Sequence, residues 1–322
     1  MRALRMTELL QAQNVTRTYQ LGRGRTLRAV DGISLALKRG ESLALVGESG
    51  CGKSTLGRLM MGFDRPDEGE ILFDGQDMAQ MGRRALRDLR SHLQMVFQDS
   101  GSSFNPRWTI GNTLAEPFRI HRREWSRATL VALLERVGLS ADYLPRYPGA
   151  LSGGQRQRLN IARAIALSPQ VIVADEPVSA LDVSVQAQIV NLLRQLQAEM
   201  GLACLFISHD LAVVRQISDR MAVMYLGAIV EEGETLALLS RPLHPYTRAL
   251  VEAVPQPGKP LAAPLQGDVP SPLSPPTGCR FHTRCPIARP RCAIERPILT
   301  DYGAGRRTAC HFPLLHDGNT AS

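Results

Sequence analysis

Short apolar runs alternate along the chain with longer segments whose apolar residues recur at helical spacing. The runs at 42–46, 171–174 and 202–207 predict buried strands, because each is nearly all apolar and ends at polar or glycine residues. Strands that alternate with helical segments are typical of an α/β fold with a mostly parallel sheet. We therefore expect a large α/β core.

The pattern changes in the middle of the chain. Between about 81 and 166, only 93–97 predicts a strand. Arginine-rich stretches at 83–93 and 126–137 have helical spacing instead. This part of the chain therefore indicates a largely helical insertion.

Proline marks a second change. Eight of the 21 prolines fall within 255–276, which predicts a stiff, extended connector rather than a helix or a central strand. We expect a core domain at 1–236, with its helical subdomain at about 81–166. An extension at 237–322 would then contain the connector and a cysteine cluster at 279–310.

The composition is that of a globular protein, since 44% of the 322 residues are apolar and 21% are charged. The best candidate for a membrane helix, at 221–230, is shorter than the roughly 18 residues required. The first eight residues carry charges with no apolar segment after them, so we predict no secretory signal and a cytoplasmic protein. The net charge of +8 is spread along the chain, which favours a solvated surface over a nucleic-acid partner.

The segment after the first predicted strand matches G-x-x-x-x-G-K-[ST] and precedes a helix-like stretch at 55–61. Such glycines let backbone N–H groups point at phosphate oxygens, and the helix N-terminus adds positive potential. Lys53 is placed to reach the β- and γ-phosphates, and the Ser54 hydroxyl to ligate Mg²⁺. A glycine-rich turn without nucleotide is the alternative, which the strand–turn–helix context disfavours. The predicted phosphate-binding residues are Gly47, Glu48, Ser49, Gly50, Cys51, Gly52, Lys53, Ser54 and Thr55.

Two carboxylates, Asp175 and Glu176, follow the apolar strand at 171–174. The carboxyl ends of parallel strands are where open α/β sheets bind ligands. We predict that Asp175 is a Mg²⁺ ligand and that Glu176 is the base that polarises the attacking water. Alone, a strand that ends in Asp-Glu more often starts a loop or caps a helix. The phosphate-binding loop upstream reverses that preference.

A second helix-like stretch begins at 151–155 with a hydroxyl and two glycines, which suits either a phosphate or a plain N-cap. This segment resembles the signature motif of ATP-binding-cassette (ABC) ATPases. The other motifs of that family follow in the expected order. Counted from Lys53, the spacing is 45 residues to Gln98 of the Q-loop, 99 to Ser152 of the signature, 122 to Asp175 and 156 to His209 of the H-loop, and Asp182 ends the D-loop.

The resemblance implies a P-loop core with a mixed sheet and an antiparallel N-terminal portion, and a helical subdomain that holds the signature. It also implies that two chains face each other head to tail, so that ATP lies between Lys53 of one chain and the signature of the other. Tyr19 would stack on adenine, and Gln98 would ligate Mg²⁺ and contact a membrane subunit. The implied catalytic residues are Glu176, His209 and Gln98, and the implied ATP contacts outside the loop are Tyr19, Gln98, Ser152, Gly153, Gly154, Gln155, Asp182 and His209.

The region after the core resembles the C-terminal extension of ATPases from dipeptide, oligopeptide and nickel importers. This likeness rests on 244–250, 269–272 and 278–286. It implies the ATP-hydrolysing subunit of a peptide importer at the cytoplasmic face of the membrane. The implied partners are two permease subunits, an external substrate-binding protein and a second ATPase, which is a homologous chain or a second copy.

Other functions stay open beside this one. They are a nickel or other ABC importer, a soluble ABC protein that acts on nucleic acid or ribosomes, and a P-loop kinase. The soluble proteins usually carry two cassettes or a long coiled-coil insertion, which this sequence does not show. The signature at 151–155 argues against the kinase.

Four cysteines lie in the last 44 residues with the spacing C-x5-C-x6-C-x17-C. A proline-rich extension with little apolar content would need a metal to supply its folding free energy. The spacing fits neither short zinc pairs nor common ferredoxin patterns, so a [4Fe–4S] cluster as in some relatives, Zn²⁺ and unliganded thiols stay open. Since the predicted nucleotide motifs all lie at or before residue 210, we expect loss of one cysteine to spare ATP hydrolysis. The four cysteines are Cys279, Cys285, Cys292 and Cys310.

Overall fold

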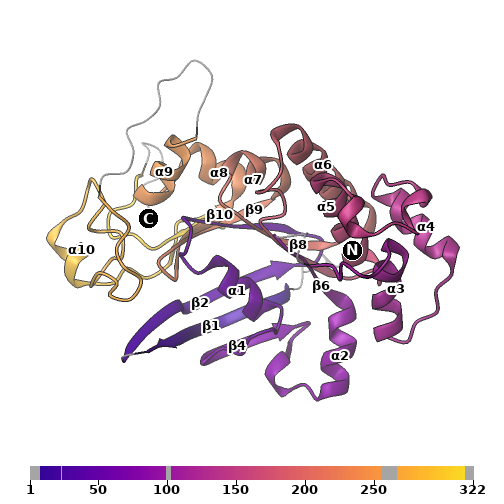
Figure 1. Cartoon of the computed structure of the whole chain (residues 1–322). Helices are drawn as coiled ribbons and strands as arrows, with labels where there is room; N and C mark the ends of the chain where they lie inside the picture. Colours follow the sequence, from indigo (N-terminus) through magenta and orange to yellow (C-terminus); the bar gives the residue numbers. More distant parts are fainter. Residues whose placement is uncertain (1–7, 23, 99–102, 255–266, 316–322) are drawn as a thin grey trace, which may run out of the picture.

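The computed structural model describes residues 8–22, 24–98, 103–254 and 267–315, and two β-sheets lie within them (Figure 1). The smaller sheet is antiparallel, in the order β2-β1-β4-β5, and comprises β1 (Glu8–Leu21), β2 (Arg25–Lys38), β4 (Glu68–Phe73) and β5 (Gln76–Asp77). The larger sheet is mixed, in the order β11-β12-β10-β9-β3-β8-β7-β6, and comprises β3 (Ser42–Val46), β6 (Leu93–Val96), β7 (Val171–Asp175), β8 (Ala203–Ser208), β9 (Arg220–Tyr225), β10 (Ala228–Glu234), β11 (Thr300–Asp301) and β12 (Arg307–Thr308).

The centre of the larger sheet is parallel, as the sequence predicts. The runs at 42–46, 171–174 and 202–207 form β3, β7 and β8, and these strands pair in parallel with one another and with β6. All three are buried along their length, so both faces must be apolar, which explains the nearly continuous apolar runs. The carboxyl ends of β3 and β7 therefore meet at one edge.

Helices cover the sheets, and α1 lies between the two (Figure 1). The helix expected at 83–93 is α2, and the helix expected at 126–137 is α4. The helix after the glycine-rich loop begins at residue 53, two residues before the expected start. The helices are α1 (Lys53–Met60), α2 (Arg83–His92), α3 (Ile110–Ile120), α4 (Arg127–Arg136), α5 (Gly153–Ile165), α6 (Val183–Met200), α7 (Leu211–Ile217), α8 (Thr235–Ser240), α9 (Pro245–Glu252) and α10 (Pro290–Ile294).

The position of α1 is fixed by a hydrophobic layer between the sheets. Leu56 and Leu59 of α1 are fully buried and share one cluster with Leu35 of β2 and Leu45 of β3. A second cluster joins α3, α4 and α5 to α6 on the other side of the larger sheet. Buried apolar contacts to both sheets therefore fix α1 and, with it, the end of the loop that precedes it.

The C-terminal extension is part of the core rather than an appendage. Its strand β12 pairs with β10 and continues the larger sheet. Phe281 is only 1% exposed, and its ring centroid lies 5.3 Å from those of Tyr225 and Tyr246. We expected the extension to need a metal for its folding free energy. The premise of that expectation, that the extension has too little apolar content to form a core, is wrong. The extension shares the hydrophobic core of the preceding domain.

The proline-rich connector expected at 255–276 lies partly outside the described residues, which omit 255–266. The remainder, 267–276, contains turns and bends without helix or strand. Among the residues that the structure describes, no helix is both long enough and apolar enough to cross a membrane.

Candidate functional site

The loop between β3 and α1 curves around the ammonium group of Lys53. Gly52 has a φ of +108°, and a Cβ there would lie 2.1 Å from the carbonyl oxygen of Ala29, so the position requires glycine. The buried Lys53 donates from Nζ to the carbonyl oxygens of Gly47 and Glu48, at 2.8 and 3.0 Å. This geometry is that of a phosphate cradle, with a cation held in the curve of the loop.

A cavity of about 310 Å³ opens over this loop, within the size range of ligand sites. It brings together predicted residues from four parts of the chain, namely Tyr19, the loop from Ser49 to Thr55, Gln98 and Glu176. Sequence reasoning missed the rest of the lining, which comes from β2, the β9–β10 turn and the extension. These residues are Leu27, Arg28, Ala29, Leu226, Gly227 and Pro272.

Pro272 is an unexpected member of this lining. It lies in the C-terminal extension, whereas the predicted nucleotide motifs all lie at or before residue 210. The extension therefore reaches the cavity formed by these motifs, while the expectation that loss of one cysteine spares ATP hydrolysis stays a prediction. Tyr19, which also lines the cavity, is half-buried beneath the guanidinium of Arg17, whose Cζ lies 5.0 Å from the ring centroid.

A hydroxyl and a carboxylate meet beneath the cavity. Ser54, at the start of α1, donates from Oγ to Oδ1 of Asp175, at the end of β7, across 3.1 Å. Burial raises the pKa of the Asp175 carboxyl, although the Ser54 hydrogen bond opposes that shift. Hydroxyl and carboxylate oxygens are donors that Mg²⁺ prefers, so the residues present fit this ion.

Glu176 is held at both of its carboxylate oxygens. Nε2 of Gln98 donates to Oε2 at 3.0 Å, and Nδ1 of His209 lies 3.2 Å from Oε1. The backbone of Glu176 has a φ of +45°, which is uncommon for any residue but glycine. Its N–H donates to the carbonyl oxygen of Ile207 at 2.9 Å, so the strained conformation is fixed by the neighbouring strand β8.

The predicted signature residues lie at the N-terminus of α5, and none of them is among those lining the 310 Å³ cavity of their own chain. Ser152 caps the helix by accepting from Gln155 N–H, and the Gln155 side chain accepts from Ser152 N–H in return. Gly154 packs against α6, because a Cβ there would lie 2.6 Å from Val185. Asp182 caps α6 by accepting from Val185 N–H at 3.0 Å.

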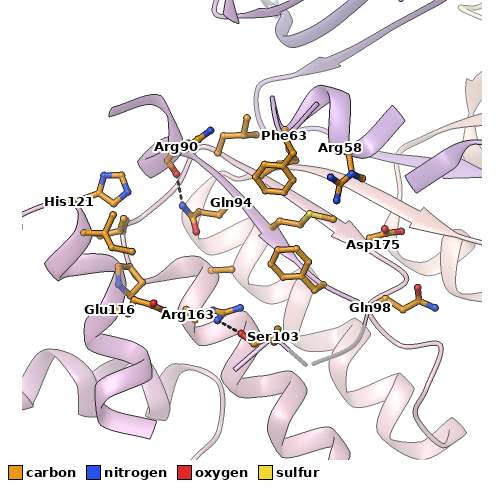
Figure 2. Close-up of a pocket in the computed structure, with 18 residues that line it drawn as sticks. Arg58, Phe63, Arg90, Gln94, Gln98, Ser103, Glu116, His121, Arg163 and Asp175 are labelled. Atoms are coloured by element: carbon orange, nitrogen blue, oxygen red, sulfur yellow. Dashed lines mark hydrogen bonds between the residues drawn. The ribbon is translucent and has the colours of Figure 1, made fainter. Parts of the chain in front are cut away.

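A larger cavity of about 680 Å³, drawn in Figure 2, shares the lining residue Gln98 with the 310 Å³ cavity. Phe63 lies on one side, and Glu116 and His121 lie at the end of α3 on the other (Figure 2). Gln98 lines both cavities, and the predicted Mg²⁺ ligand Asp175 also lines the larger one.

The four cysteines of the extension gather around a cavity of only about 10 Å³. Burial, with the other cysteines nearby, raises the pKa of Cys310 to about 12. In the part of the chain that the structure describes, no group of three or more His, Cys, Asp or Glu side chains is arranged to hold a metal ion. The thiols are close together, but their placement does not support a metal site. The cysteines are Cys279, Cys285, Cys292 and Cys310.

Comparisons with known proteins agree with this geometry. Residues 30–179 match the ABC transporter family, and residues 230–292 match the family described as the oligopeptide/dipeptide transporter C-terminal region. The oligopeptide transport ATP-binding protein OppF of Escherichia coli is 52% identical over 85% of both chains. The oligopeptide transport ATP-binding protein AppF of Bacillus subtilis is 50% identical, over 89% of this chain and 90% of AppF.

A solved structure supports the same class. It is a dimeric ATP-binding cassette in a post-hydrolysis state bound to ADP and phosphate, and it matches with a TM-score of 0.64 at 30% identity. The match covers 70% of this chain and 99% of the cassette. The fold and the site define an ABC ATPase, an enzyme that hydrolyses ATP. The chain belongs to the ABC transporter ATP-binding proteins that carry the oligopeptide/dipeptide transporter C-terminal region.

Proposed function

We propose that this chain energises the import of dipeptides or oligopeptides across a membrane. The observation that carries the cargo class is the match of 230–292 to the oligopeptide/dipeptide transporter region. The names of the relatives OppF and AppF support the same cargo. The proposed organisation is an ATPase domain at 1–236, with a helical subdomain at about 81–166, and an extension at 237–322.

The proposed chemistry is the attack of water on the γ-phosphate of ATP. Lys53 and the backbone N–H groups of its loop bind the phosphates, and Ser54 and Asp175 hold Mg²⁺, which neutralises phosphate charge when bound. Glu176 takes the proton of the attacking water, and His209 contacts the γ-phosphate. The contacts among Ser54, Asp175, Glu176 and His209 support these roles.

The nucleotide site is proposed to be completed by a second ATPase, either another copy or a homologous chain. The signature residues from Ser152 to Gln155 lie outside the cavity of their own chain, which supports a role toward a partner's ATP. The solved cassette in the comparisons is itself a dimer. ATP would close such a head-to-tail dimer, and hydrolysis would open it.

The 680 Å³ groove is the proposed contact for a permease subunit (Figure 2). Gln98 supports this proposal because it lines the groove and also binds Glu176. A change in the position of Gln98 at the groove would therefore reach the proposed catalytic carboxylate of Glu176 directly. The full assembly would contain two permeases and an external substrate-binding protein, with this chain on the cytoplasmic face of the membrane.

A [4Fe–4S] cluster in the extension is a separate proposal, with Zn²⁺ as the alternative. The gathering of four cysteines around one small cavity supports it, and the absence of a metal-holding arrangement among the described side chains opposes it. Anaerobic purification followed by metal analysis decides the matter. About four iron atoms per chain would support the cluster, one zinc would replace it, and metal-free protein would exclude both.

Uptake measurements test the cargo. A strain that lacks this gene should lose uptake of labelled dipeptides or oligopeptides, and the wild-type gene should restore uptake while Glu176→Gln should not. A strain that keeps its peptide uptake but loses nickel uptake would instead establish the nickel importer. The Glu176→Gln variant is the matched control, because it differs from the wild type by a single non-hydrogen side-chain atom.

A further inference from the structure

Glu48, the second residue of the phosphate-binding loop, is tied to the C-terminal extension. Its carboxylate accepts from Nη1 and Nη2 of Arg284, at 2.8 and 3.1 Å, in a two-pronged ion pair. Its N–H donates to the hydroxyl of Tyr246 at 2.9 Å. Its carbonyl oxygen accepts from Lys53 Nζ at 3.0 Å. One residue thus connects the phosphate-binding ammonium group to the extension.

The ion pair between Arg284 and Glu48 has little freedom to rearrange. The Arg284 side chain is 6% exposed and that of Glu48 is 24% exposed. Arg284 also donates to the hydroxyl of Tyr225 at 3.4 Å, and the ring of Tyr225 lies 4.6 Å from that of Tyr246, centroid to centroid. Removing one partner of so buried a pair leaves an uncompensated charge on the other.

An unpaired negative charge on Glu48 would be unfavourable in the phosphate-binding loop. The loop binds phosphates, and an unpaired Glu48 carboxylate would repel them. Arg284 neutralises that carboxylate and fixes its direction. Proximity to the nucleotide is supported independently by Pro272, which belongs to the same extension and lines the nucleotide cavity.

Arg284 is not required merely to keep the extension in place. Arg296 of the extension pairs with Asp31 of β2 at 2.7 Å. Arg307 donates to Glu232 of β10 at 2.6 Å, within the strand pairing of β12. These contacts anchor the extension independently of Arg284, so loss of Arg284 alone should leave the extension docked.

We propose that Arg284 is a positioning residue for the nucleotide site, and that through Glu48 the extension sets the ATP affinity of its own chain. This inference rests on the proposed phosphate-binding role of the Lys53 loop. The inference adds Arg284 to the residues that act on the proposed nucleotide site, although Arg284 lies more than 200 positions away from the loop in sequence.

The experiment measures the Kd of the purified full-length chain for a fluorescent ATP analogue with Mg²⁺, and the KM and kcat for ATP. Arg284→Met should raise Kd and KM about tenfold and leave kcat within about twofold, because Arg284 does not contact Glu176 or Asp175 in the described structure. The double variant Glu48→Gln/Arg284→Met should return Kd to within about threefold of wild type, since the repelling charge is gone. The matched control is Arg291→Met, which breaks an exposed pair with Glu295 in the same extension and should leave Kd unchanged.

Lys53→Met separates this inference from the proposed function. If Lys53→Met weakens binding but Arg284→Met binds like wild type, the inference is overturned and the function stands. If Lys53→Met binds like wild type, the proposed nucleotide site itself is wrong. Should Arg284→Met fail to fold by circular dichroism, Arg284→Lys keeps the charge but loses the two-pronged geometry and should raise Kd about threefold. A wild-type Kd for Arg284→Lys would then overturn the inference.

Discussion

Nδ1 of His209 lies 3.2 Å from Oε1 of Glu176, so the loop after β8 reaches the carboxylate at the end of β7. The second oxygen of that carboxylate accepts from Gln98, which follows β6. Three segments that follow parallel strands therefore converge on one carboxylate. A general base that is oriented before water arrives needs little reorganisation during the reaction.

Glu176→Gln should lower kcat for ATP hydrolysis by at least about 100-fold while Kd for ATP stays within about threefold. The amide keeps the shape and the hydrogen bond to Gln98 but cannot take a proton from water. Phosphate release and nucleotide binding on the purified chain check the two parts separately. Glu199→Gln is the matched control, because it makes the same change on an exposed residue of α6. Wild-type hydrolysis by Glu176→Gln would assign the base to another residue.

A charged side chain at Gly153 should block ATP-driven dimerisation without affecting nucleotide binding by the single chain. A Cβ at Gly153 would lie 3.5 Å from Leu181, an ordinary contact, so Gly153→Asp should fold. In the Glu176→Gln background, which slows turnover, size-exclusion chromatography with ATP should show the dimer, and adding Gly153→Asp should abolish it. Equal loss of ATP binding by the isolated chain would place the signature in the chain's own pocket.

Gly154 is less suitable for that test, and the structure gives the reason. A Cβ at Gly154 would lie 2.6 Å from Cγ1 of Val185 in α6. Gly154→Ala should therefore lower the melting temperature, whereas Gly153→Ala should not. Thermal unfolding of the two variants checks this difference, and equal melting temperatures would contradict it.

Because the buried Cys204 thiol has a raised pKa, we expect the protein to lose stability at alkaline pH. Cys204 is 2% exposed in β8, and burial raises its pKa to about 12. An unfolded thiol ionises near pH 8.5, so above that pH the unfolded chain holds fewer protons than the folded one, and the free energy of unfolding falls by up to about 1.4 kcal/mol per pH unit. Between pH 8 and 10, wild type should lose about 2 kcal/mol more than Cys204→Ala in urea unfolding. An equal loss in both proteins would contradict the assignment.

The motifs that could be predicted from the sequence are local ones. The loop from Gly47 to Thr55 combines glycines at fixed positions with Lys53, so its predicted chemistry is encoded in nine consecutive residues. Asp175 and Glu176 could be placed because they follow a continuous apolar strand. The contact of Asp175 with Ser54 follows from the parallel pairing of β3 and β7 with β8.

The contribution of the extension could not be predicted in this way. Arg284 and Glu48 are 236 residues apart, and an arginine among 35 arginines carries no signal of its own. The structure of the apolar run at 221–230 could not be predicted from the sequence either. It forms most of the hairpin of β9 and β10. Leu226 and Gly227 make its two-residue turn with φ values of +42° and +82°. A leucine is unusual in such a turn, so the sequence gives no turn signal there.

Docking of the extension should survive removal of any metal, but not the loss of Phe281. Phe281 fills the core between Tyr225 and Tyr246, and truncation of a buried phenylalanine to alanine costs about 3 to 5 kcal/mol. Hydrogen exchange at Ala309, whose N–H donates to the carbonyl oxygen of Val230 at 2.8 Å, reports the pairing of the extension with β10. Protection there should persist after chelator treatment and fall in Phe281→Ala, while Ile298→Ala, at a side chain 78% exposed, should behave like wild type. Loss of protection on chelation with normal protection in Phe281→Ala would mean that a metal, rather than the shared core, holds the extension.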